Sequence, residues 1–221
     1  MSKMKVGLVG CGNIGADLCI ALQRGEIPAE ICALTDIEES HAERLKRSFL
    51  LNAAICPLEE NVARADFVVE CAAADAVQRV VETAIRHGKD CLVISIGGLM
   101  EHQDLFEQAR RNHRRIWLPS GALCGLDGVR AAAESGLHLV QLTTRKPPKG
   151  LEGAPYLLEH GIDLSNLAAP MVVFEGSARE ACQAFPKNVN VAAALSFAGV
   201  GPEQTRVRVV ADPAATANSH E

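Results

Sequence analysis

Residues 6–15 read Val-Gly-Leu-Val-Gly-Cys-Gly-Asn-Ile-Gly. The apolar start predicts a buried strand, and the spacing of the three glycines at its end is typical of a tight turn into a helix. Such a turn brings backbone N–H groups and the positive end of a helix close to a pyrophosphate. We therefore predict a dinucleotide-binding loop rather than a purely structural turn, with cofactor contacts from Gly10, Gly12, Asn13, Ile14 and Gly15.

A second apolar run, at residues 31–36, ends at Asp36 about twenty residues after the glycines. A carboxylate at this position accepts hydrogen bonds from both ribose hydroxyls. Ile37 and Glu38 follow it where an arginine would favour a 2′-phosphate, so the sequence favours NAD, with NADP as the alternative cofactor. Cys71 and Ala72 follow another buried strand and are expected at the same edge of the sheet as the glycines.

Strand and helix patterns alternate from residue 5 to residue 119, which predicts a doubly wound parallel sheet of the Rossmann type. Beyond Leu123 the strands are separated by longer loops, which predicts an antiparallel or mixed sheet in a second α+β domain. We place a dinucleotide-binding domain at residues 1–121 and a substrate and oligomerisation domain at residues 122–221.

Composition narrows the function further. The chain has 221 residues, 48% of them apolar, and a net charge of −5, so we expect a globular protein without a nucleic-acid or membrane partner. The eight cysteines form no CxxC pair, which argues against a metal site and for a reducing, cytoplasmic location. A catalytic cysteine is disfavoured because neither Cys71 nor Cys124 has a basic neighbour in sequence.

The second half carries polar residues that suit a substrate. Ser120 follows a strand end, while Arg145 and Lys146 place cations that suit a carboxylate at another strand end. Asn188 is a natural helix cap, and His220 is a natural acid/base group. The residues alone also allow purely structural roles: a tight turn at Ser120, a solvated strand end at Arg145 and Lys146, a helix cap at Asn188 and a solvated tail at His220.

Several segments together resemble one family. They are Gly10–Gly15, Asp66–Ala73, Ser120–Ala122 with Gly125–Asp127, Thr144–Pro148, Phe185–Val191 and Ala217–Glu221. In this order, over nearly the whole chain, they resemble the L-aspartate dehydrogenase family. The glycine segment is generic, whereas the four later segments are specific in combination.

This resemblance implies NAD(P)-dependent oxidation of L-aspartate to iminoaspartate, which hydrolyses to oxaloacetate and ammonia or feeds pyridine nucleotide biosynthesis. It also implies that His220 is the catalytic residue and that Ala122 and Asn190 contact the cofactor. We expect a homo-oligomer, with a homodimer as the simplest form. Family members continue past the His-Glu pair with a further strand and a helical segment, so we expect the second domain to be incomplete at Glu221.

Two alternatives share the nucleotide-binding half. One is a related two-domain dehydrogenase or reductase of the homoserine dehydrogenase or dihydrodipicolinate reductase type, which differs in the second domain. The other is a non-catalytic NAD-binding protein. Substrate-dependent formation of NADH distinguishes all three.

Overall fold

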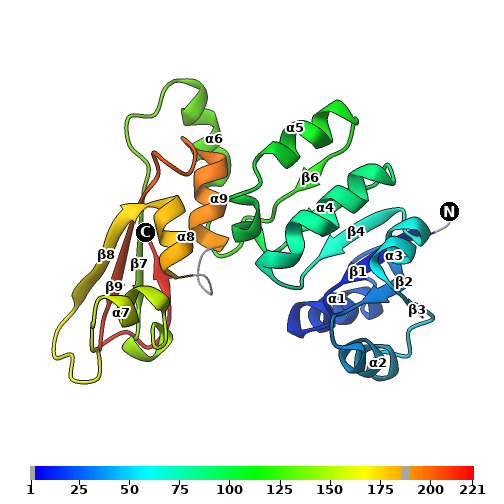
Figure 1. Cartoon of the computed structure of the whole chain (residues 1–221), viewed down its shortest axis with the longest axis horizontal. Helices are drawn as coiled ribbons and strands as arrows, with labels where there is room; N and C mark the ends of the chain where they lie inside the picture. Colours follow the sequence, from blue (N-terminus) through cyan, green and yellow to red (C-terminus); the bar gives the residue numbers. More distant parts are fainter. Residues whose placement is uncertain (1–2, 186–189) are drawn as a thin grey trace. The chain divides into compact units, whose positions relative to one another are not determined.

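The computed structural model describes residues 3–185 and 190–221. The chain divides into two compact units, Met1–Pro119 and Ser120–Glu221, each with a sheet of its own (Figure 1). None of the helices within the described ranges has both the length and the apolar content that a membrane span requires.

The first unit alternates strands with helices. Its elements are β1 (Met4–Val9), α1 (Asn13–Gln23), β2 (Ala29–Thr35), α2 (Glu39–Ser48), β3 (Ala54–Ile55), α3 (Leu58–Arg64), β4 (Phe67–Glu70), η1 (Ala74–Ala76), α4 (Val77–Arg86), β5 (Asp90–Val93), η2 (Ile96–Leu99), α5 (Asp104–Arg111) and β6 (Ile116–Trp117). The strands pair in parallel in the order β3-β2-β1-β4-β5-β6. The predicted doubly wound sheet is therefore confirmed.

The strand order places a ligand site in this sheet. From β1 the chain moves outward to β2 and β3, then returns to the other side of β1 as β4. The direction of winding thus reverses between β1 and β4, and crevices at the carboxyl ends of such strands bind ligands in open α/β sheets. Gly10 follows β1 and Cys71 follows β4, so the glycine loop lies at this crevice.

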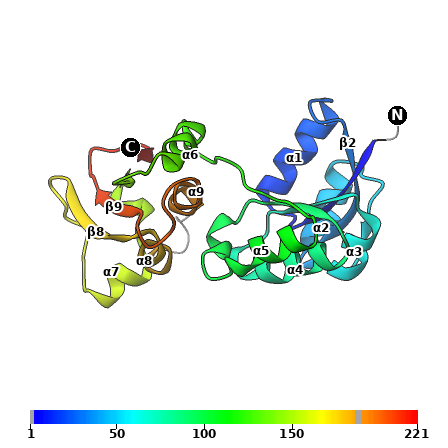
Figure 2. The ribbon, with the colours of Figure 1, turned by 90° about the horizontal axis from the view of Figure 1, so that it is seen from above.

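Helices cover the two faces of the sheet, and their apolar residues form its core. Cys19 of α1 and Ala42 and Leu45 of α2 pack with Leu8 of β1 and Leu34 of β2, and all five are at most 4% exposed. Helices α3, α4 and α5 lie side by side in a separate row (Figure 2). The sequence pattern did not predict α3. This helix has only two turns, and so few of its residues are apolar that no helical periodicity is visible.

The second unit combines a mixed sheet with short helices. Its elements are α6 (Leu126–Glu134), β7 (Gln141–Lys146), η3 (Pro148–Gly150), α7 (Pro155–Glu159), β8 (Met171–Ser177), α8 (Ala178–Ala184), α9 (Asn190–Ala198), β9 (Arg206–Ala211) and β10 (Ser219–His220). The strand order is β10-β7-β9-β8. The β7–β9 pair is parallel, while β8 and β10 run antiparallel to their neighbours, so the sheet is mixed as predicted.

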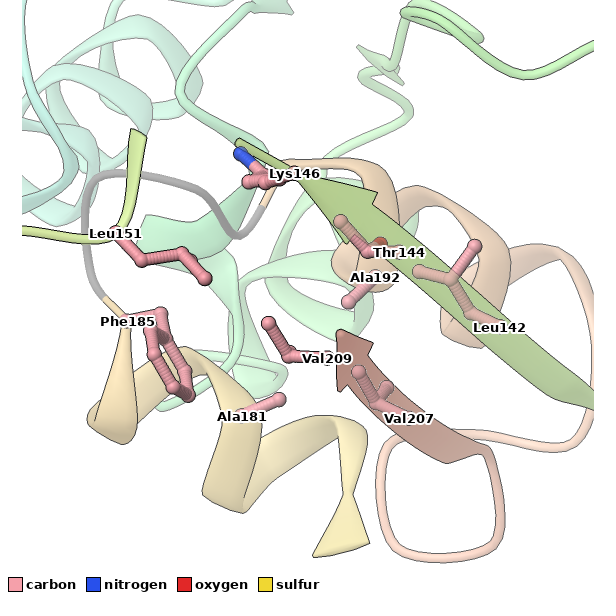
Figure 3. Close-up of a pocket in the computed structure, with 9 residues that line it drawn as sticks. All are labelled: Leu142, Thr144, Lys146, Leu151, Ala181, Phe185, Ala192, Val207 and Val209. Atoms are coloured by element: carbon pink, nitrogen blue, oxygen red, sulfur yellow. The ribbon is translucent and has the colours of Figure 1, made fainter. Parts of the chain in front are cut away.

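Strand β7 presents two different faces. Leu142, Thr144 and Lys146 are buried at alternate positions, whereas Thr143 and Arg145 between them are half-buried. These three buried side chains lie on the face of the sheet that α8 and α9 cover. Val207 and Val209 of β9 lie on the same face (Figure 3). Because side chains alternate along a strand, neighbouring residues of β7 belong to different environments.

Candidate functional site

The three glycines of the loop have three different roles. Gly10 has a φ of +96°, and a Cβ there would lie 2.5 Å from the backbone of Cys71 and Ala72. A Cβ on Gly15 would lie 3.0 Å from the carbonyl oxygen of Gly10, so this glycine brings α1 close to the strand. A Cβ on Gly12 would meet nothing within 4 Å. Folding therefore requires glycine at 10 and 15, while at 12 the open space suits an approaching ligand.

The N-terminus of α1 faces the same loop. Gly12 is its N-cap and provides no side chain to accept the first N–H groups, and the first turn has no acidic residue. Asn13 and Ile14 begin the helix and are both exposed. Uncapped N–H groups at the positive end of a helix dipole are suited to an anion such as pyrophosphate.

Asp36 connects the end of β2 to the glycine loop. Its Oδ2 accepts a hydrogen bond of 2.7 Å from the amide of Cys11, and its Oδ1 accepts one of 2.9 Å from the amide of Glu38. His41 lies with Nδ1 3.4 Å from Oδ1, and the Asp36 side chain is 10% exposed. A carboxylate offers about four acceptor positions. These contacts fix its orientation and leave acceptor capacity for ribose hydroxyls.

Cys71 and Ala72 lie on the opposite side of the loop. The Cys71 thiol donates a 3.1 Å hydrogen bond to the carbonyl oxygen of Gly10. Burial raises the pKa of Cys71 to about 12, so the thiol stays protonated and is not a nucleophile. Ala72 is exposed at the carboxyl end of β4, beside the crevice.

Glu70, which is not among the predicted site residues, connects the loops at this edge of the sheet. The carboxylate is completely buried and accepts hydrogen bonds from the amide of Ala72 at 2.8 Å and from the amide and hydroxyl of Ser95 at 3.0 and 2.9 Å. Burial raises the pKa of Glu70, although these hydrogen bonds act in the opposite direction. Glu70 thus joins the loops that follow β4 and β5. A carboxylate closing the apolar run at 67–70 was the available signal.

In the second unit, strand β10 brings His220 onto β7. His220 pairs with Thr144 across the antiparallel ladder, and its Nδ1 lies 3.1 Å from the Thr144 hydroxyl oxygen. Burial and the positive charge of Lys146 lower the pKa of His220 below its ordinary value of 6.5. The imidazole is therefore neutral near pH 7 and has a nitrogen lone pair with which to accept a proton.

Lys146 belongs to the same face as His220. It is 4% exposed, and burial lowers the pKa of its ammonium group. Figure 3 shows Lys146 and Thr144 projecting from β7 at a cavity of about 20 Å³ that Leu151 and Phe185 help to line. A cation, a hydroxyl and a histidine are thus combined at one end of the sheet.

Arg145, predicted to act beside Lys146, lies on the opposite face of β7. Its Nη1 donates a 3.1 Å hydrogen bond to Oδ2 of Asp212, whose side chain is 11% exposed. Asp212 is fixed in turn, because its Oδ1 accepts a hydrogen bond from the amide of Ala214. The structure therefore does not bring the two cations together, and strand alternation is the physical reason.

The remaining predicted residues lie in loops and at helix ends. Ser120 and Ala122 are exposed in the loop between β6 and α6. Asn190 is the first residue of α9 and is exposed. Asn188 lies outside the described residues. Thr144 belongs to the segment Thr144–Pro148 but is not among the predicted site residues, although its spacing of two residues from Lys146 indicates a shared face of the strand.

Comparison with known proteins gives two family matches that follow the two units. Residues 10–119 match the model described as homoserine dehydrogenase, NAD binding domain. Residues 127–221 match the model described as aspartate dehydrogenase, C-terminal. The first match supports a pyridine nucleotide-binding unit, and the second separates the chain from relatives that share only this unit.

Full-length relatives agree with the second match. A protein of Methanosarcina mazei named L-aspartate dehydrogenase is 46% identical, covering 99% of this chain and 82% of the relative. One of the same name from Bradyrhizobium diazoefficiens is 42% identical, covering 99% of this chain and 78% of the relative. The crystal structure of aspartate dehydrogenase from Thermotoga maritima has a TM-score of 0.75 at 29% identity, covering 99% and 83% of the two chains. By its sequence and its fold, this chain belongs to the L-aspartate dehydrogenase family.

Proposed function

We propose that the chain oxidises L-aspartate, with NAD as hydride acceptor, to iminoaspartate, which hydrolyses to oxaloacetate and ammonia. Membership of the L-aspartate dehydrogenase family supports this reaction. The observation that carries the proposal is the pairing of His220 with Thr144 on the Lys146 face of β7. That arrangement supplies a neutral base and a cation, the two groups that oxidation of an amino dicarboxylate requires.

The residues of the first unit fit NAD. In this proposal the loop from Gly10 to Gly15 and the start of α1 bind the pyrophosphate, and Asp36 accepts hydrogen bonds from the ribose hydroxyls. The exposed side chains after Asp36 are Ile37 and Glu38, which offer no positive charge to a 2′-phosphate. NAD is therefore favoured over NADP. When bound, the nicotinamide ring supplies the hydride acceptor.

His220 has the role of base in this proposal. The amino group of aspartate must be neutral when hydride leaves Cα, and the free ring nitrogen of His220 accepts the ammonium proton. After His220 has released this proton to solvent, the same nitrogen can accept a proton from the water that attacks the imine carbon. Its lowered pKa keeps it unprotonated at neutral pH, as both steps require.

Lys146 holds a substrate carboxylate in this proposal. It shares the face of His220, and a charge-assisted hydrogen bond to a carboxylate would offset the cost of burying its ammonium group. Arg145 was expected to share this role, and in this proposal it instead stabilises the sheet through its ion pair with Asp212 on the other face of β7. Ser120 and Asn188 stay proposed substrate contacts, and Cys71, Ala72, Ala122 and Asn190 proposed cofactor contacts.

A screen of substrates tests the proposal. The purified chain is mixed with NAD and each of L-aspartate, L-homoserine and L-alanine, and NADH is followed by its absorbance. We expect NADH only with aspartate, together with release of ammonia. NADH formation with homoserine would favour the related dehydrogenase, and NAD binding without turnover would identify a non-catalytic NAD-binding protein. Either result would overturn the proposal.

We further propose a cytoplasmic homodimer that supplies pyridine nucleotide biosynthesis. All eight cysteines are free thiols, as suits a reducing compartment.

The domain boundary was expected after Gly121, and the compact units divide after Pro119. We accordingly assign cofactor binding to the first unit and substrate chemistry to the second.

A further inference from the structure

The register of the ladder between β7 and β10 explains why Thr144 and His220 touch. Thr143 and Glu221 exchange two backbone hydrogen bonds, of 2.8 and 3.0 Å, between amide and carbonyl groups. The neighbouring pair, Thr144 and His220, is therefore of the non-hydrogen-bonded kind, in which the Cα atoms lie closest and side chains meet. The backbone thus fixes the approach of the hydroxyl to the ring.

The contact engages one ring nitrogen and leaves the other available. Nδ1 lies 3.1 Å from the Thr144 oxygen, and Nε2 has no hydrogen-bond partner within residues 3–185 and 190–221. A neutral imidazole carries one N–H and one lone pair, and the partner of one nitrogen decides which nitrogen carries the proton. Because burial and Lys146 keep His220 neutral, the tautomer determines whether its accessible nitrogen can act as a base.

We propose that Thr144 is a positioning residue for His220: its hydroxyl oxygen accepts a hydrogen bond from Nδ1–H and so keeps the lone pair on Nε2. This inference rests on the proposed role of His220 as the base of the reaction. Thr144 touches neither substrate nor cofactor in this scheme. It acts only through the orientation and tautomer of the imidazole.

The cavity beside Thr144 makes this hydrogen-bond direction feasible. A buried hydroxyl that accepts from the ring must donate its own proton elsewhere, or it loses a hydrogen bond. The cavity of about 20 Å³ is lined by Thr144 and Lys146 and has room for about one water molecule. Such a water would accept a hydrogen bond from the Thr144 hydroxyl, so the hydroxyl would lose no hydrogen bond.

Kinetics of three variants test the inference, with Thr143 as a matched control. Thr143 is the same residue type one position away, on the opposite face of β7. We expect Thr144→Val to lower kcat for aspartate about tenfold, the value of one hydrogen bond, with NAD affinity unchanged. Thr144→Ser should restore most of the loss, and Thr143→Val should leave kcat near that of the wild type. Equal losses in the two valine variants, or no rescue by serine, would overturn the inference.

A spectroscopic measurement tests the tautomer without any substrate. Nitrogen chemical shifts of ¹⁵N-labelled histidine distinguish Nδ1–H from Nε2–H rings, and comparison with His220→Gln assigns the His220 signals. We expect the Nδ1–H tautomer in the wild type and in Thr144→Ser, and a mixture in Thr144→Val. An Nε2–H ring in the wild type, or an unchanged tautomer in Thr144→Val, would overturn the inference. If the wild type shows the Nδ1–H ring but does not oxidise aspartate, the proposed function fails while the positioning of His220 stands.

Discussion

The backbone amide of Cys11 donates a hydrogen bond of 2.7 Å to the carboxylate of Asp36, so the glycine loop and the end of β2 hold each other in place. The two residues are 25 positions apart in the sequence. In the scheme proposed here, one binds beside the pyrophosphate and the other binds the ribose. Their contact fixes the spacing between two parts of the same ligand before that ligand arrives, which lowers the entropy cost of binding.

Replacing Asp36 should weaken NAD binding. Asp36→Ala removes a charged acceptor of hydrogen bonds, a loss of roughly 1.5 to 3 kcal/mol, or about 10- to 150-fold in affinity. Isothermal titration measures it, with the exposed Asp17→Ala on α1 as the control for lost charge. The double variant Asp36→Ser/Ile37→Arg should shift preference towards NADP. Unchanged NAD affinity in Asp36→Ala would refute the ribose assignment.

The glycines should separate folding from binding. Gly12→Val adds a side chain in open space, so we expect an unchanged melting temperature and no measurable NAD binding. Gly15→Val forces a Cβ to within 3.0 Å of the Gly10 carbonyl oxygen and should destabilise the fold by roughly 1 to 3 kcal/mol. Thermal melts and NAD titrations measure both effects. A lowered melting temperature in Gly12→Val would make Gly12 a structural glycine.

Removing His220 should abolish most turnover. His220→Ala should lower kcat by roughly 10² to 10⁴ with NAD affinity nearly intact, since only proton transfer is lost. In the wild type, kcat/KM should rise with pH as His220 deprotonates, below its ordinary pKa of 6.5, and rise further as the substrate ammonium deprotonates. The pH profile of kcat/KM for aspartate measures both steps. Retained turnover with the same profile in His220→Ala would return this residue to a structural role.

Lys146 and Arg145 should differ sharply when each is replaced by methionine. Lys146→Met should raise KM for aspartate about 10- to 150-fold and move the acidic limb of the pH profile to higher pH, because the charge that lowers the pKa of His220 is gone. Arg145→Met should leave KM unchanged and cost at most about 1 kcal/mol of stability, since its ion pair with Asp212 is partly exposed. Equal effects on KM would contradict the assignment of the two faces.

Glu70 should make stability depend on pH. Burial raises its pKa in the folded state above the ordinary 4.5, so the native state binds a proton more tightly than the unfolded state. The stability contributed by this group is therefore fully present below pH 4.5 and is lost as pH rises through the raised pKa. Denaturant unfolding between pH 4 and pH 8 should show this loss in the wild type and in the exposed control Glu43→Gln, but not in Glu70→Gln. If the free energy of unfolding depended on pH in the same way in all three proteins, this contribution of Glu70 would be excluded.

Much of the first unit could be predicted because its signals are local. A short apolar run, a glycine turn and a helix stripe each occupy a few residues, and their alternation determines the parallel order. In the second unit, the sequence pattern predicts a helix over residues 126–134, and α6 has these bounds, Leu126–Glu134. By contrast, the alternating pattern of residues 136–145 predicts a strand from Gly136, but β7 begins only at Gln141. Gly136 has a φ of +85°, which strands do not adopt.

The missed features depend on contacts between distant residues. The role of Glu70 depends on Ser95, 25 positions later, and the position of His220 depends on a ladder to residues 76 positions earlier. Neither contact produces a periodic pattern of apolar residues in the sequence. The alternation of side chains along a strand already placed Arg145 and Lys146 on opposite faces of β7, which two adjacent cations at a strand end did not suggest.

The ladder between β7 and β10 ties the reaction to a local equilibrium that no active-site contact reveals. It joins His220 to a residue 76 positions earlier in the sequence. Local pairing of this kind can open at a lower free energy than global unfolding. The proposed base is in place only in molecules in which β10 is paired with β7, and the measured rate is the intrinsic rate multiplied by the population of those molecules. A substitution that weakens this pairing should therefore lower the rate without touching substrate or cofactor.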